Sequence, residues 1–186
     1  RLSNITVGLI GVGRVGIRVI KHLSGFDNPK ILANDVSSSV KKLDLPVEWT
    51  DKERILKEAD VVTLHLPLTK LTKNLIKKKD LMSMKKDGII INTSRGGIIN
   101  EKDLYTVMKS GHLNGAAIDV FEKEPYEGPL KDIERCLLTS HIGSMSTDCR
   151  IKMEIQATEE VVRFFNGKSL QRQVPIEEYD VQKMNL

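Results

Sequence analysis

Aromatic residues are scarce in this 186-residue chain, at 4% of the total, and cysteine occurs only twice. So few rings argue against a base-stacking platform for single-stranded nucleic acid. Cys136 and Cys149 have neither CxxC spacing nor a nearby histidine pair, so we expect no disulfide framework and no metal site, and a reducing cytoplasm fits. No apolar run approaches the roughly 18 residues of a membrane span, and no secretory signal is visible, so we expect no membrane partner.

The residues that are present form an ordinary globular mixture, with 40% hydrophobic and 29% charged side chains. The length suits one domain with a single core. The net charge of +4 comes from scattered lysines such as Lys41, Lys42 and the run at 77–79, which are typical of a solvated surface. We therefore expect no nucleic-acid partner.

The chain opens at Arg1 and soon reaches an apolar strand, so we expect it to be part of a longer sequence.

Short apolar runs alternate with longer segments of helical periodicity, which predicts parallel βαβ units. Most of the runs are continuously apolar, as expected when helices cover both faces of a sheet. The sequence thus predicts an α/β fold of the Rossmann type, a doubly wound parallel sheet in three αβα layers. The expected strands are Ile5 to Ile10, Ile31 to Asn34, Val47 to Trp49, Val61 to Leu66, Ile89 to Asn92, Ala116 to Val120 and Cys136 to Thr139.

Four helices are expected between and after these strands. The first covers Val15 to Leu23, and the second runs to Ala59 after a capping box of Thr50 and Glu53. The third spans Glu101 to Ser110 and stops at Gly111, a good C-cap. The last runs from about Thr147 to Asn166, and we expect it to bury four apolar residues. These are Ile151, Ile155, Val162 and Phe165.

Gly11, Gly13 and Gly16 form a G-x-G-x-x-G pattern between the first strand and the first helix. In this context the glycines permit a tight turn, close approach of a pyrophosphate and close helix–strand packing. Asp35 lies 22 residues after Gly13, where a carboxylate accepts the ribose hydroxyls of NAD and repels the 2′-phosphate of NADP. The alternative is three turn glycines and a solvated aspartate. Lys41 and Lys42 could still tolerate the 2′-phosphate of NADP.

Polar or glycine-rich residues follow six of the expected strands, at the edge where open α/β sheets bind ligands. Besides Gly11 and Asp35 they are His65, the turn Thr93 to Gly97, Asp119, and His141 to Ser144. His141 is the better acid/base candidate because small, flexible residues follow it, whereas His65 could be a packed histidine at a strand end. Arg95 suits a bidentate grip on a carboxylate. Glu122 and Glu124 could both be solvated loop charges.

Five stretches of the chain resemble, in order and spacing, the NAD-binding domain of the D-isomer-specific 2-hydroxyacid dehydrogenases. The resemblance covers about Thr6 to Gly167, and its motifs are VGLIGVGRVG, ADVVTLHLPLTKLT, MKKDGIIINTSRGGIIN, GAAIDVFEKEP and LLTSHIGS. It implies hydride transfer between NAD(H) and C2 of a 2-hydroxy or 2-oxo acid, with phosphoglycerate dehydrogenase-like activity as the best single guess. Glu124 stands where formate dehydrogenases of the superfamily carry glutamine, which disfavours that branch.

The resemblance also assigns roles to residues. It makes Arg95 the substrate-carboxylate arginine, His141 the proton donor and acceptor, and Glu124 the carboxylate that favours the charged form of the imidazole. Arg14 and Val15 are implied to contact the pyrophosphate and Asp119 to face the nicotinamide carboxamide. The remaining cofactor-binding residues implied by the same motifs are Leu64, His65, Leu66, Pro67, Thr93, Ser94, Arg95, His141, Gly143 and Ser144.

The resemblance further implies a flavodoxin-like substrate domain, which we expect to be absent from this chain. We expect residues 1–167 to form the NAD-binding domain and 168–186 a tail, with weak NADH binding and little turnover by the chain alone. Family members usually dimerise through this domain, so a homodimer is expected, with the helix at Glu101 to Ser110 contributing. An alternative from another class is an NADH-sensing module like a corepressor, without useful turnover.

Overall fold

The computed structural model describes residues 1–27 and 29–173, which divide into two compact units. The first unit is Arg1–Ser140, and the second begins at His141. Each unit is described by itself below. The predicted domain boundary at Gly167 stays a prediction.

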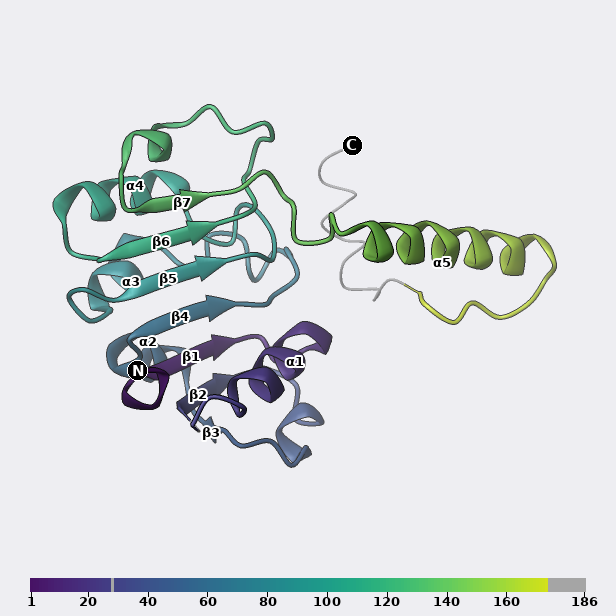
Figure 1. Cartoon of the computed structure of the whole chain (residues 1–186), viewed down its shortest axis with the longest axis horizontal. Coiled ribbons are helices and arrows are strands. Elements are labelled where there is room, and N and C mark those ends of the chain that lie inside the picture. The colour runs from purple at the N-terminus through teal and green to yellow at the C-terminus, as the bar shows by residue number, and fades with distance from the viewer. Residues whose placement is uncertain (28, 174–186) are drawn as a thin grey trace. The chain divides into compact units, whose positions relative to one another are not determined.

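The first unit is built on a seven-stranded sheet in which every pairing is parallel (Figure 1). The strand order is β3-β2-β1-β4-β5-β6-β7. Its first six strands have the order of dinucleotide-binding sheets, which confirms the predicted fold class. The strands are β1 (Thr6–Ile10), β2 (Lys30–Asn34), β3 (Glu48–Trp49), β4 (Val61–Leu64), β5 (Ile89–Asn92), β6 (Gly115–Ile118) and β7 (Cys136–Leu138).

Two apolar clusters lie on opposite faces of this sheet. Val7 and Leu9 of β1 pack in one cluster with Ile20 of the first helix. Leu32, Val62 and Ile90 belong to the other cluster, together with residues of the next three helices. Side chains alternate between the faces of a strand, so a buried strand must be apolar on both sides, which explains the continuous apolar runs.

In the described residues of the first unit, four helices and two short 3₁₀ segments lie between the strands, and a third 3₁₀ segment precedes β1. The C-cap prediction at Gly111 is confirmed, because this residue adopts a left-handed φ of 76° after the fourth helix. The helices are α1 (Arg14–Leu23), α2 (Lys52–Glu58), α3 (Lys78–Ser83) and α4 (Glu101–Ser110), and the 3₁₀ segments are η1 (Leu2–Asn4), η2 (Val40–Lys42) and η3 (Pro129–Asp132).

The structure corrects one expectation about these helices and adds a helix that was not predicted. The cap of α2 is Asp51, whose side chain accepts the N–H of Arg54, so the Thr50–Glu53 capping box was wrong. No pattern in the sequence indicated α3, a short helix in a lysine-rich stretch. Its Asp80 is buried and accepts the backbone N–H of Lys77, while its other oxygen lies 2.8 Å from Nζ of Lys52. This ion pair ties α3 to α2.

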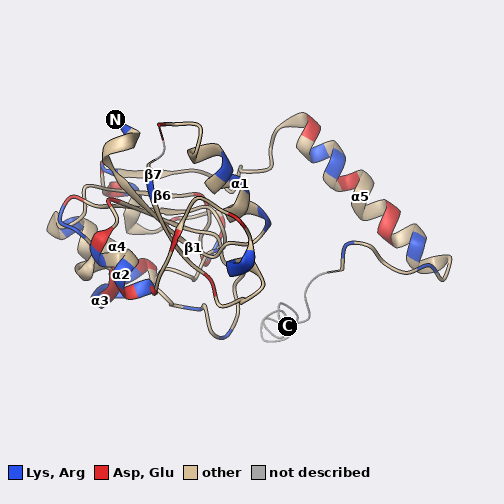
Figure 2. Ribbon diagram, turned by 90° about the horizontal axis from the view of Figure 1, so that it is seen from below, with Lys and Arg blue, Asp and Glu red and all other residues tan. Residues whose placement is uncertain are grey.

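The described part of the second unit contains one helix, α5 (Thr147–Phe165), close to the predicted range. The prediction that four apolar residues of this helix are buried was wrong. Ile151, Ile155 and Val162 are about half exposed, and Phe165 is 81% exposed. An apolar helix face is buried only against another element, and residues 141–173 offer no other helix or strand. Charged residues of both signs lie along α5 (Figure 2), and Arg150 pairs with Glu154. Within the described residues, no helix is long and apolar enough to span a membrane.

Candidate functional site

Backbone hydrogen bonds join the carboxyl ends of the strands into one edge of the sheet. Gly11 donates to Asn34 at 2.9 Å, and His65 donates to Ile10 at 2.8 Å. Further along the sheet, Asp119 donates to Asn92 at 3.0 Å. The strands β4 and β6 end two residues earlier than predicted, so His65, Leu66 and Asp119 lie in the loops of this edge. The edge thus carries the predicted polar residues of the first unit.

The glycine-rich turn has a different steric reason for each glycine. Gly11 has a φ of +92°, and a Cβ on it would lie 2.5 Å from the carbonyl oxygen of His65. A Cβ on Gly16 would lie 2.5 Å from the carbonyl oxygen of Gly11, so this residue allows α1 to pack against the turn. A Cβ on Gly13 would meet nothing within 4 Å. The space before α1 is therefore open to a ligand, and the other two glycines serve the fold.

The start of α1 is suited to an anion. Gly13 is its N-cap and supplies no side-chain acceptor, and the first turn holds no acidic residue. The predicted contact residues Arg14 and Val15 are both exposed there. Unpaired N–H groups and the helix dipole favour a phosphate at such an end. The open Cβ position of Gly13 and this bare helix start both fit the pyrophosphate of a dinucleotide.

Asp35 is held firmly beside the same turn. One carboxylate oxygen accepts the N–H of Val12 and the other accepts the N–H of Ser37, each at 2.7 Å. Each carboxylate oxygen has a second lone pair, so both can still accept a hydroxyl. Asp35 is partly exposed, as a ribose-binding carboxylate must be.

The loop after β4 presents His65, Leu66 and Pro67, of which Pro67 is exposed. Burial lowers the pKa of His65, so its ring is neutral at neutral pH, and Nε2 lies 3.1 Å from the Thr63 hydroxyl. The side chain of Leu64 is fully buried in the core, so its predicted contact with the cofactor would have to use the backbone and stays a prediction.

The turn after β5 is organised by Asn92. Its side-chain oxygen accepts both the N–H and the hydroxyl of Ser94, and its amide nitrogen donates to the carbonyl of Arg95 at 3.0 Å. This leaves Thr93 and Arg95 exposed, with Nη1 of Arg95 donating to the Ser94 carbonyl. Asn92 is itself buried, so its hydrogen bonds fix the backbone of the turn that carries Arg95.

The loop after β6 contains Asp119 and Glu124. Asp119 is buried, and its carboxylate accepts the hydroxyl of Thr139. Glu124 is exposed, and its Oε1 accepts the N–H of Phe121 at 3.0 Å. The loop after β6 is therefore held by its own carboxylates.

Gly96 brings the Arg95 turn against the Glu124 loop. A Cβ on Gly96 would lie 2.0 Å from the carbonyl oxygen of Phe121 and 2.6 Å from the N of Glu122. Only a residue without a side chain allows this approach. Arg95 and Glu124 therefore come from two turns that meet at the Phe121–Glu122 peptide.

Glu101 is a residue of this region that the sequence analysis did not single out. It is the first residue of α4, and its Oε1 accepts the N–H of Glu122 at 2.6 Å. Burial, and then the charges of Glu122 and Glu124, raise the pKa of its carboxyl group. No sequence signal separates it from an ordinary first-turn glutamate.

His141, Gly143 and Ser144 belong to the second unit, before α5. His141 is exposed and has a left-handed φ of 54°. Such a φ is uncommon outside glycine, although histidine is enriched there. The grouping of these three residues with Arg95 and Glu124 stays a prediction.

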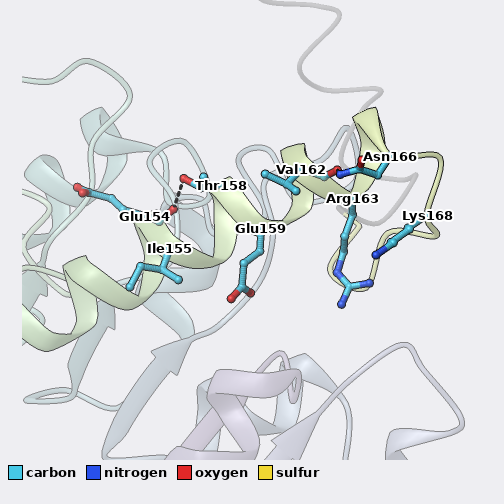
Figure 3. Close-up of a pocket in the computed structure, with 8 residues that line it drawn as sticks. All are labelled: Glu154, Ile155, Thr158, Glu159, Val162, Arg163, Asn166 and Lys168. Carbon is cyan, nitrogen blue, oxygen red and sulfur yellow. Dashed lines mark hydrogen bonds between the residues drawn. The ribbon is translucent and has the colours of Figure 1, made fainter.

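A separate hollow of about 600 Å³ runs along α5 and the segment after it (Figure 3). None of the predicted site residues lines it. Its lining residues are Glu154, Ile155, Thr158, Glu159, Val162, Arg163, Asn166 and Lys168.

Comparison with known proteins decides the family. Residues 1–143 match the family model described as D-isomer specific 2-hydroxyacid dehydrogenase, NAD binding domain. This chain belongs to that family. NAD is accordingly the cofactor of this domain, and the open turn at Gly13 and the fixed Asp35 suit it.

Three relatives illustrate the similarity of this family member. A hydroxypyruvate reductase from Thermotoga maritima is 38% identical over 85% of the chain, and a glyoxylate reductase from Thermofilum pendens is 37% identical over 90%. The crystal structure of D-lactate dehydrogenase with NAD⁺ from Lactobacillus jensenii matches 94% of the chain and 56% of its own length, with 28% identity and a TM-score of 0.80.

This chain spans about half the length of the two curated relatives, 52% of the hydroxypyruvate reductase and 50% of the glyoxylate reductase. All three relatives are reductases or dehydrogenases by name. They give no support to the corepressor-like alternative.

Proposed function

We propose that the protein containing this chain is an NAD-dependent oxidoreductase of small D-2-hydroxy and 2-oxo acids. The observation that carries the proposal is the meeting of the Arg95 turn and the Glu124 loop at Gly96, on the edge of an NAD-binding sheet. An arginine and a carboxylate beside a nicotinamide suit a substrate that has both a carboxylate to hold and a carbonyl to protonate.

Each proposed catalytic residue has one task. Arg95 binds the substrate carboxylate through two parallel N–H bonds and so orients C2. His141 donates a proton to the carbonyl oxygen during reduction and accepts it during oxidation. Glu124 favours the charged imidazole at the moment of donation. NADH, when bound, supplies the hydride that C2 receives.

We propose the following cofactor contacts for the remaining site residues. Gly13, Arg14 and Val15 contact the pyrophosphate, and Asp35 accepts the adenosine ribose hydroxyls. Backbone and side chains at 65–67 and 93–95, which are exposed or partly exposed, line the nicotinamide side, with Asp119, Gly143 and Ser144 nearby. The support is the exposure of the loops in the first unit together with the family match.

The substrate class is a small 2-oxo acid, and phosphoglycerate dehydrogenase-like activity is one member of it. The named relatives act on glyoxylate and hydroxypyruvate, which have the same carboxylate next to a carbonyl. A homodimer and a cytoplasmic location belong to the same proposal.

Steady-state kinetics of the complete protein test this proposal. We expect reduction of at least one of glyoxylate, hydroxypyruvate, pyruvate and 3-phosphohydroxypyruvate, with NADH preferred over NADPH because Asp35 repels the extra phosphate. His141→Gln should lower kcat by about 10²- to 10⁴-fold through loss of the proton donor.

The control is His22→Gln, which alters an exposed histidine of α1 and should keep the wild-type kcat. A near-normal rate for His141→Gln would remove His141 as the acid/base. A wild-type protein that reduces none of the four acids would refute the function itself.

A further inference from the structure

The Phe121–Glu122 peptide is a shared support for the two turns that carry Arg95 and Glu124. Gly96, next to Arg95, lies directly against this peptide. The preceding N–H, that of Phe121, is accepted by Glu124. Any tilt of this peptide would therefore move both functional side chains at once.

The N–H of the same peptide is held by a residue from a different element. Glu101, the first residue of α4, accepts the Glu122 N–H at 2.6 Å across 21 residues of chain. This is a charge-assisted bond and among the shorter ones of its kind. Asn100, the N-cap of α4, accepts the N–H of Asp103, so Glu101 is not needed as the cap.

The Glu101–Glu122 bond is itself exposed, but the backbone just before it is packed against the core. Val120 and Phe121 are buried, and the Phe121 ring stacks on Tyr126 with ring centroids 4.1 Å apart. Burial also raises the pKa of the Glu101 carboxyl group. The bond therefore ties the exposed end of a packed segment to the start of α4.

We propose that Glu101 is a positioning residue, whose carboxylate fixes the Phe121–Glu122 peptide and so sets the placement of Glu124 relative to Arg95. It touches neither substrate nor cofactor. The inference rests on the proposed function for its catalytic consequence, but the bond itself can be tested without any substrate.

The test uses Glu101→Ala, which removes the acceptor, and Glu101→Gln, which keeps an oxygen in the same place. Glu53→Ala is the matched control, because Glu53 is also a first-turn helical glutamate but its side chain is 70% exposed. In the complete protein, Glu101→Ala should lower kcat about 10- to 100-fold, the order expected for a displacement of about 1 Å in a catalytic group. NADH affinity should stay at the wild-type value, and Glu101→Gln should recover most of kcat.

A second measurement on this chain follows the amide proton of Glu122 by NMR. A short bond to a carboxylate places this proton downfield, so Glu101→Ala should move it upfield while Glu53→Ala leaves it in place. An unchanged kcat in Glu101→Ala, or a loss that Gln does not recover, would overturn the positioning role. A Glu122 resonance unaffected by Glu101→Ala would overturn the bond.

These outcomes separate the two proposals. If the wild-type protein reduces no 2-oxo acid, the proposed function fails and the catalytic consequence fails with it. The Glu122 resonance then still decides whether Glu101 holds the peptide.

Discussion

At the scale of single residues, three glycines most closely constrain the site: Gly11 and Gly13 after β1, and Gly96 after β5. Gly11 and Gly96 allow backbones to approach where a Cβ would collide, whereas Gly13 leaves space that the protein itself does not fill. The first two are requirements of the fold. We propose that the third is a requirement of the cofactor, and this difference can be measured.

Gly96→Ala should destabilise the protein strongly. The new Cβ would lie 2.0 Å from the Phe121 carbonyl oxygen, so the Arg95 turn and the Glu124 loop must move apart. We expect the free energy of unfolding to fall by about 3 kcal/mol, at the upper end of the usual cost of overpacking. Urea denaturation measures this directly.

Gly13→Ala is the matched control for that substitution. Its Cβ enters open space at a φ of −78°, which any residue adopts, so a loss of no more than about 1 kcal/mol is expected. Equal losses for the two variants would contradict the assigned contact between the turns.

At the scale of elements, the sheet and the long helices could be predicted because their apolar periodicity is strong. The alternation of strands and helices was enough for the parallel sheet, and α4 follows its predicted range to the residue. The strand ends were less predictable. Apolar Leu66 and Val120 continue the pattern of β4 and β6 after the hydrogen-bonded ladder has stopped.

The elements that sequence reasoning missed are those whose stability comes from distant contacts. The helix α3 has only six residues, too few to form by local preference, and it depends on Asp80 meeting Lys52 from α2. Glu101 was missed for the same reason, since its partner lies 21 residues away. The proposed site residues of the first unit could be named from the sequence because each follows a strand, and the strands of a parallel sheet end at the same edge.

The Asp80–Lys52 pair predicts a pH dependence of stability. Burial alone would raise the pKa of Asp80, but the bonds from Lys52 and from the Lys77 N–H outweigh it, so the pKa in the folded protein is lowered from 3.8. A lowered pKa means that the carboxylate contributes stability above its unfolded pKa and loses it as pH falls through the folded value.

The free energy of unfolding of Asp80→Asn should therefore be about 1–3 kcal/mol below wild type at pH 7, because a buried charge-assisted bond is weakened. The difference should shrink as pH falls through the lowered pKa of the folded carboxylate, where wild-type Asp80 takes up a proton. Denaturation at several pH values measures it, with the exposed Asp44→Asn as the control. A difference that does not change with pH would show that the charge of Asp80 contributes nothing.

At the scale of the whole molecule, the first unit carries the cofactor-binding edge, the proposed substrate arginine and the proposed carboxylate on one sheet. The proposed acid/base, His141, begins the second unit. The exposed apolar residues of α5 were expected to be buried, and this error has a physical source. Helical periodicity shows which face of a helix is apolar, but not which surface covers that face.

The measurement that tests the central claim most directly is calorimetric titration of NADH into this chain and into Gly13→Ala. The account predicts one weak site on the folded wild-type chain, with NADPH binding less well because of Asp35. Gly13→Ala should weaken NADH binding by at least about tenfold, equivalent to 1.4 kcal/mol, because its methyl group enters the space proposed for the pyrophosphate. A folded wild-type chain that binds no NADH, or a Gly13→Ala variant that binds it as tightly as wild type, would contradict the account.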